Sequence, residues 1–338
     1  MADTEQSKVD EATAAFARSA AEVINIRLDQ IGALSQGLLD VQDTRPAAEM
    51  YLATRRMRVA LGVFKPVFPK AQYRNGREET RVLAKAVAVR HRLDVSIEIM
   101  QSVVDEMDEQ DAAGAEVLIK DLDRQRTLAN RELGRVVHGR RMHAYRVRME
   151  DLVDAAVGPD MELPDRYRPM RTAPGSVIKL VDRRLQKLRS FAPEALEPGA
   201  TGEQRRMGVA AEMLRYTLEL TGEALGTQAH TARRAARGLQ ASLTEIVDCE
   251  RMLSQVRDRV LALEKEDATV IAERARGARD LDPVLVQAAP NRNSYRGLEM
   301  ISVHLQARET MVFESFRRLW KEQSRQGVWV ALENSLKQ

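Results

Sequence analysis

The chain has 338 residues, of which 44% are hydrophobic, 4% aromatic and 30% charged, and its net charge is only +3. General nucleic-acid binders carry a strong basic excess, so this balance argues against that class of protein. The single cysteine, Cys249, excludes an intrachain disulfide and a metal site built from several cysteines.

Composition and apolar spacing predict an all-α protein of long helices. Alanine, leucine, glutamate and arginine favour helices, and we find no convincing strand. The first helix is expected from about Val9 to Leu39, and the second begins at Thr44 and Pro46 and reaches about Phe64. Further helices are expected over residues 77–108, 112–157 with a break near Gly139, 177–191, 202–225, 229–264 and 294–323.

Residues 158–176 carry four prolines and no helical periodicity, so they predict a linker between two halves of the chain. The N-terminal half then covers residues 9–157 and the C-terminal half residues 177–323. Residues 1–8 are expected to be flexible, and residues 324–338 form a C-terminal tail. Trp329 in that tail is a candidate interface residue.

The stretch "LATRRMRVAL" places three arginines in the second helix. At about 100° per residue, Arg55 and Arg58 share one face, one turn apart, and Arg56 lies on the flank. Two such guanidinium groups can bind adjacent phosphates, or they can pair with carboxylates of a neighbouring helix. Both interpretations remain open from these residues alone.

Four short segments carry a family resemblance: "DTRPAAEMYLATRRMRVALGVF", "VAVRHRLDV", "EMLRYTLE" and "LQASLTEIVD". In order and spacing they resemble the motifs of the CHAD domain, the conserved histidine α-helical domain, from about Val9 to Trp320. Besides the arginines of "ATRRMR", the matching residues are Leu93, Asp94, Val95, Leu214, Arg215, Tyr216, Glu219, Leu239, Gln240, Leu243 and Asp248.

The resemblance implies two four-helix-bundle halves related by a pseudo-twofold, with arginines lining a basic central channel that binds inorganic polyphosphate or a related polyanion. The implied mechanism is electrostatic attraction that weakens as salt rises. The expected main contacts are Arg55, Arg58 and Arg215, and the secondary positions are Arg205, Arg56, His91 and Arg92. For the further basic positions Arg183, Arg184, Lys187, Arg233 and Arg237 we expect a solvated face.

Several motif positions depart from the family pattern. The first motif's histidine falls at Ala48 and its next arginine at Tyr51, and the lysine of the second half is replaced by Glu212. A carboxylate at Glu212 would repel phosphate or pair with Arg215 or Arg205.

The alternative is therefore a CHAD-like helical scaffold or partner-binding protein that has lost phosphate binding. Its Arg55 and Arg58 would then pair with carboxylates such as Glu212, Glu219 or Asp94.

Motifs of enzymes and membrane proteins are not found. His138 and His143 are five residues apart, whereas metal ligands on one helix face lie three or four apart. No glycine-rich phosphate loop, nucleophile motif, signal peptide or run of ~18 apolar residues occurs. We expect a cytoplasmic, non-enzymatic protein without cofactor or metal, associated with polyphosphate granules if the resemblance holds.

Overall fold

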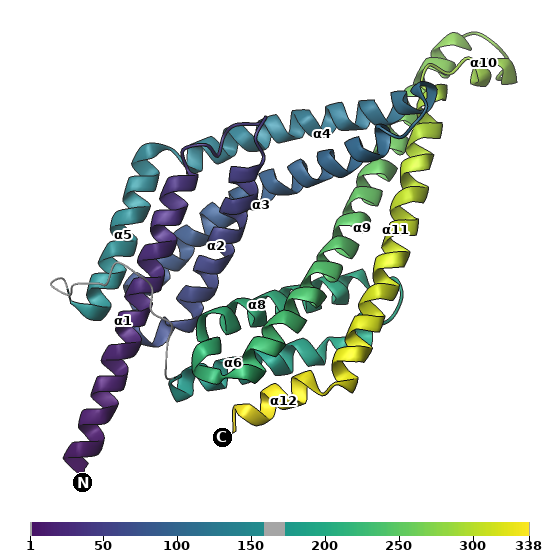
Figure 1. Cartoon of the computed structure of the whole chain (residues 1–338). Coiled ribbons are helices and arrows are strands. Elements are labelled where there is room, and N and C mark those ends of the chain that lie inside the picture. Colours follow the sequence, from purple (N-terminus) through teal and green to yellow (C-terminus); the bar gives the residue numbers. More distant parts are fainter. Residues whose placement is uncertain (1, 159–172, 338) are drawn as a thin grey trace. The chain divides into compact units, whose positions relative to one another are not determined.

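The computed structural model describes residues 2–158 and 173–337, and all regular structure within these ranges is helical (Figure 1). The predicted all-α class is therefore confirmed. The side chains of residues 2–10 and of Gln110 are outside the description. The elements are α1 (Ala2–Leu34), α2 (Arg45–Val63), η1 (Lys65–Val67), α3 (Lys70–Val104), α4 (Glu109–Val136), α5 (Gly139–Val157), α6 (Gly175–Ser190), α7 (Ala192–Ala195), α8 (Thr201–Leu225), α9 (Thr227–Arg274), α10 (Pro283–Gln287), α11 (Arg292–Arg325) and α12 (Val328–Ser335).

The helix boundaries differ from prediction at a few places. Helix α1 begins at Ala2 rather than near Val9, and the expected break near Gly139 separates α4 from α5. The short α10 falls between the helices predicted over residues 229–264 and 294–323, and α12 falls in the predicted tail. Most of the predicted linker, residues 159–172, lies outside the described residues.

The chain forms two compact units. The first comprises residues 1–91, 129–243 and 316–338, and the second comprises residues 92–128 and 244–315. Helices α3, α4, α9 and α11 contribute residues to both units. Each unit thus draws on both sides of the predicted linker, and the pseudo-twofold relation of two halves stays a prediction.

In the first unit, α1 lies between α5 and α2 and packs on both (Figure 1). Helix α2 also packs on α8, which in turn packs on α6 and α7. Apolar residues at helical spacing, such as Ile24 on α1 and Met57 on α2, are completely buried. Phe16 and Phe64 add a ring contact of 5.1 Å between centroids. This packing fixes which residues of α2 face α8.

The C-terminal tail belongs to the core of the first unit. Helix α12 packs on α6, and Trp329 is only 3% exposed. Its ring stacks on Trp320 at 5.9 Å between centroids. The prediction that Trp329 offers an interface is therefore wrong, because the apolar face of α12 closes over the first unit and buries the indole.

In the second unit, α4 and α11 approach each other closely. A Cβ atom at Gly114 would lie 1.9 Å from the carbonyl oxygen of Ser294, and one at Gly297 would lie 1.8 Å from that of Asp111. Two glycines therefore permit a backbone-to-backbone contact that any side chain would prevent. Among the described residues, no helix has both the length and the apolar composition needed to cross a bilayer.

Candidate functional site

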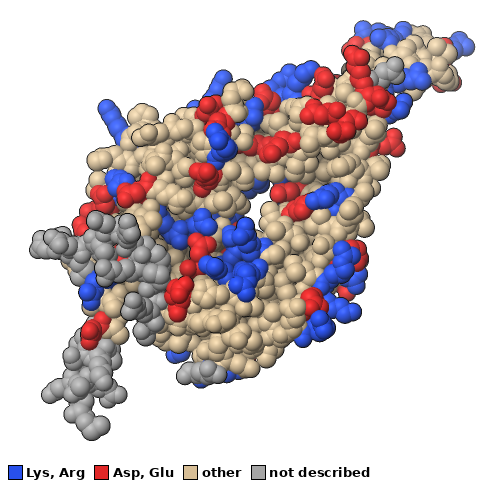
Figure 2. Space-filling view, in the orientation of Figure 1, with Lys and Arg blue, Asp and Glu red and all other residues tan. Residues whose placement is uncertain are grey.

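The arginines of α2 meet the carboxylates of α8 inside the first unit. Arg55 Nε lies 2.5 Å from Glu212 Oε1, and Arg56 Nε lies 3.0 Å from Glu219 Oε1. Arg27 Nη2 on α1 is a second cation for Glu219, at 3.7 Å. Figure 2 shows Lys and Arg atoms gathered where α2 meets α8, with Asp and Glu atoms between them.

Arg55 is held by two residues of the protein, Glu212 and Tyr51. Besides the pair with Glu212, its Nη1 donates to the hydroxyl of Tyr51 at 2.5 Å, and its guanidinium lies 4.9 Å from the Tyr51 ring centroid. Burial on its own would lower the pKa of Arg55, but Glu212 and Tyr51 outweigh it and the net pKa is raised. Glu212 is itself buried and also accepts from Gln240 Nε2 at 3.5 Å. The guanidinium of Arg55 is therefore held by groups of the protein.

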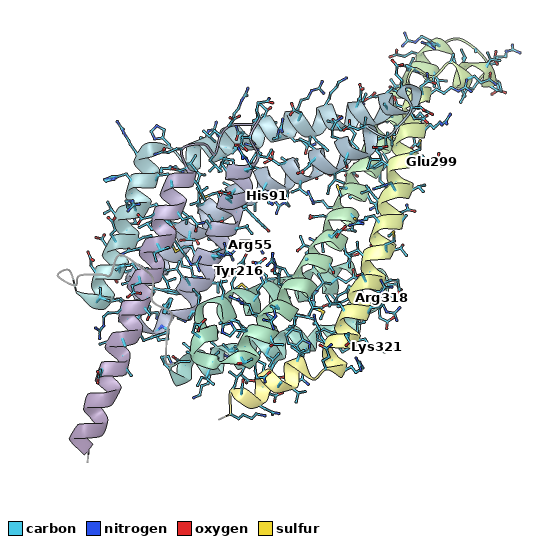
Figure 3. All side chains as sticks on the ribbon, viewed as in Figure 1. Arg55, His91, Tyr216, Glu299, Arg318 and Lys321 are labelled. Atoms are coloured by element: carbon cyan, nitrogen blue, oxygen red, sulfur yellow. The ribbon has the colours of Figure 1, made fainter. Side chains whose placement is uncertain are left out.

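Tyr51, which replaces an arginine of the family pattern, connects the site to α3. Its ring packs against the ring of His91, with 4.6 Å between centroids and a tilt of 35°. Figure 3 labels His91 and Arg55. His91 is half-buried in this contact. The residue that sequence reasoning counted as a loss thus positions both Arg55 and His91.

Arg58 has a different environment, although it lies one turn from Arg55. Its side chain is exposed, and it forms no ion pair with any described residue. Its pKa is lowered by partial burial first and then by the like charge of Arg55, with smaller effects of Arg77 and Arg81 on α3. Glu212 opposes this shift. Arg58 is therefore surrounded mainly by positive charges, and this arrangement favours the binding of an anion.

Sequence reasoning did not identify Arg77 as part of this group. Arg77 is exposed, one turn before Arg81 on α3, and Arg81 already pairs with Glu78. Arg77 and Arg81 lie about one helical turn apart, as Arg55 and Arg58 do. This spacing in the sequence could have indicated Arg77 as a further member of the group.

Arg215 contributes from α8 and stacks on an aromatic ring. Its guanidinium carbon lies 4.0 Å from the Tyr216 ring centroid, and that of Arg56 lies 5.5 Å from the same centroid. The Nε of Arg215 is buried without a hydrogen-bond partner among the described residues. Burial raises the pKa of Tyr216, against the opposing effect of Arg215. Arg215 thus forms no ion pair with a carboxylate of the described residues.

The remaining predicted positions are spread over both units. Arg205 is exposed near the start of α8, about 15 Å along the helix from Arg215 at 1.5 Å per residue. Arg92 belongs to the second unit, where its carbonyl accepts from Arg251. Asp94, a predicted alternative partner of the α2 arginines, lies 3.8 Å from Arg126 in that unit. The structure therefore brings together Arg55, Arg56, Arg58, His91 and Arg215.

Arg184 on α6 does not lie on a solvated face, and that prediction is wrong for this residue. Its Nη1 donates to the Met213 carbonyl at 3.0 Å and to the Thr217 hydroxyl on α8. Burial lowers the pKa of Arg184 to about 10, with a smaller contribution from Arg183. The long side chain reaches across to α8 because α6 and α8 pack side by side.

Comparison with known proteins agrees with the resemblance seen in the sequence. Residues 22–257 match the family described as CHAD domain. No curated protein matches the chain. Among solved structures, PptA from Streptomyces chartreusis has a TM-score of 0.57 at 14% identity, over 90% of this chain and 99% of its own.

A second similar structure is the CHAD domain from the plant Ricinus communis. It has a TM-score of 0.54 at 17% identity, over 83% of this chain and 91% of its own. At these identities, the likeness of both structures concerns the fold alone.

Proposed function

The chain belongs to the CHAD domain family, and on that premise we propose that it binds inorganic polyphosphate, or a polyanion of similar charge density, without catalysis. The family is known for polyphosphate binding and is generally a non-catalytic binding domain. The contacts we propose for this chain are Arg58 and Arg77, with Arg215 contributing from α8.

The observation that carries this proposal is the exposed guanidinium of Arg58, which forms no ion pair with any described residue. An exposed guanidinium with cationic neighbours and no carboxylate partner gains free energy when a phosphate approaches. Arg215 adds a second, half-buried guanidinium that forms no ion pair with a described carboxylate. A flexible chain of phosphates can follow separated cations, whereas a single compact anion contacts only one or two of them. Further predicted contacts along a central channel, Arg205 and Arg92 among them, remain proposals.

The variants that test this proposal are Arg58→Ala and Arg215→Ala. Each should lower the affinity for long-chain polyphosphate about tenfold at low salt, because a charge-assisted contact of roughly 1.5 kcal/mol is lost. Arg45→Ala is the matched control, since Arg45 begins the same helix, is exposed and pairs with Asp43. Fluorescence anisotropy with labelled polyphosphate measures all three. Equal affinities for the three variants and the unaltered protein would overturn the proposed contacts.

A second candidate function is favoured by the two ion pairs of α2. Arg55 with Glu212 and Arg56 with Glu219 are the kind of pairing expected of a helical scaffold that has lost its ligand. In that case the purified protein binds no polyphosphate even at low ionic strength. A binding measurement at low salt therefore separates the two functions.

A further inference from the structure

Glu212 lies at the centre of the candidate site. Its side chain is buried, and its two oxygens contact Arg55 at 2.5 Å and Gln240 at 3.5 Å. It is also the carboxylate whose charge acts on Arg58 and on Tyr216. One acidic residue thus pairs directly with Arg55 and acts on Arg58 only through its charge, without an ion pair.

The face of α2 that carries Arg55 and Arg58 consequently has one arginine accessible to an anion and one already paired within the protein. Arg58 and Arg77 are exposed, and neither forms an ion pair with a described residue. Arg55, one turn away, is held by Glu212 and by the Tyr51 hydroxyl. An incoming anion can contact Arg58 directly, but it must displace the Glu212 carboxylate to reach Arg55.

We infer that Glu212 is an internal competitor for the anion site and determines its specificity for polyanions of high valence. This inference rests on the proposed function and adds to it. A single phosphate that exchanges with Glu212 replaces one anion by another and gains little. A phosphate chain already bound at Arg58 presents its next phosphates to Arg55 at a high effective concentration, and it can displace the carboxylate.

The experiment compares Glu212→Gln with Glu203→Gln, which removes the same charge from the same helix. Glu203 is the matched control because it pairs with Arg206 in the first turn of α8. Isothermal titration calorimetry is carried out on the full chain with tripolyphosphate and with long-chain polyphosphate at low salt. Glu212→Gln should bind tripolyphosphate about tenfold more tightly than Glu203→Gln does, and should gain less with the long chain.

Two further variants establish that the gain comes from Arg55. In the double variant Arg55→Ala with Glu212→Gln, the gain for tripolyphosphate should disappear. Glu212→Asp keeps the charge but shortens the side chain, so it should show a smaller gain of the same kind. It also provides the test if Glu212→Gln fails to fold, because removing one partner of a buried ion pair destabilises a protein. Circular dichroism verifies the fold of each variant.

The outcomes separate this inference from the proposed function. If Glu212→Gln and Glu212→Asp bind tripolyphosphate no more tightly than Glu203→Gln, the competitor role is overturned, even if the unaltered chain binds long polyphosphate. If the unaltered chain binds no polyphosphate but Glu212→Gln does, the proposed function fails and the competitor role stands. If no variant binds either ligand, both are overturned.

Discussion

Arg55 and Arg58 lie one turn apart on α2, but their neighbours give them different properties. Arg55 is engaged by Glu212 and Tyr51, whereas Arg58 is exposed beside Arg77 and has no carboxylate partner among the described residues. The helical spacing predicted their shared face. It could not predict which one would be paired, because that depends on a residue of α8 far away in the sequence.

The Tyr51 hydroxyl provides a stability prediction for the residues around Arg55. Tyr51→Phe should lower the free energy of unfolding by about 1 kcal/mol, because the 2.5 Å hydrogen bond from Arg55 is lost. Tyr73→Phe is the control, since Tyr73 contacts Lys65 through its ring. Urea unfolding followed by circular dichroism measures both variants. A Tyr51→Phe protein as stable as the control would show that the hydroxyl contributes nothing.

For Arg184 we predict a gain, rather than a loss, in the free energy of unfolding on substitution. Its guanidinium is half-buried and forms no ion pair with a described carboxylate, and this burial lowers its pKa to about 10. Arg184→Met should therefore stabilise the protein by about 1 kcal/mol or more. The acceptors are not left unsatisfied, because the Thr217 hydroxyl still donates to the Met213 carbonyl at 2.6 Å.

The control for Arg184→Met is Arg183→Met, which changes the exposed neighbour and should alter stability by less than about 0.5 kcal/mol. Both are measured by urea unfolding. A loss of stability in Arg184→Met would mean that its hydrogen bonds to α8 contribute more than the buried charge costs.

At the scale of elements, the close approach of α4 and α11 gives the sharpest prediction. Gly114→Ala should lower the melting temperature by about 4 °C or more, because the new Cβ would lie 1.9 Å from the Ser294 carbonyl oxygen. The clash exceeds the gain in helix propensity of roughly 1 kcal/mol.

The matched control is Gly139→Ala at the start of α5, where a Cβ would meet no atom within 4 Å. Its melting temperature should stay equal or rise slightly. Amide hydrogen exchange should show the loss of protection in Gly114→Ala concentrated at the N-terminal turns of α4 and α11. Protection lost evenly along the chain would contradict a local contact.

Most helices were predictable from the sequence, because apolar spacing is a local property. The exceptions have physical reasons. Helix α12 follows Gly327, whose positive φ of 67° permits a sharp turn after α11, and its eight residues are too few for a clear period. The role of Gly114 and Gly297 could not be predicted, because a glycine inside a helix indicates only weak propensity until the neighbouring backbone is known.

At the scale of the whole molecule, family membership was predictable from four short motifs, but the division into compact units was not. Each unit combines residues distant in sequence, and α3, α4, α9 and α11 belong to both. The candidate site follows the same pattern. Its arginines are visible in two motifs, but their compensation by Glu212 and Glu219 depends on the packing of α2 on α8.

The net charge of +3 also bears on the proposed binding of a polyanion. With so small an excess, a weak general attraction is expected, and affinity should come from a few local cations such as Arg58. Duplex DNA, which is stiffer and carries its charge on a wider surface, should therefore bind much more weakly than polyphosphate of equal charge. Competition of the two ligands in one anisotropy assay measures this difference, and equal competition would indicate a general cation surface.

The salt dependence of long-chain polyphosphate binding by the unaltered protein is the clearest test of the proposed function. Binding should be readily measurable at 50 mM salt. The affinity should be lower by roughly tens of fold at 200 mM, as expected for about four phosphate contacts. The logarithm of the affinity should fall linearly with the logarithm of the salt concentration, and less steeply in Arg58→Ala. No binding at low salt, or an affinity independent of salt, would contradict the account.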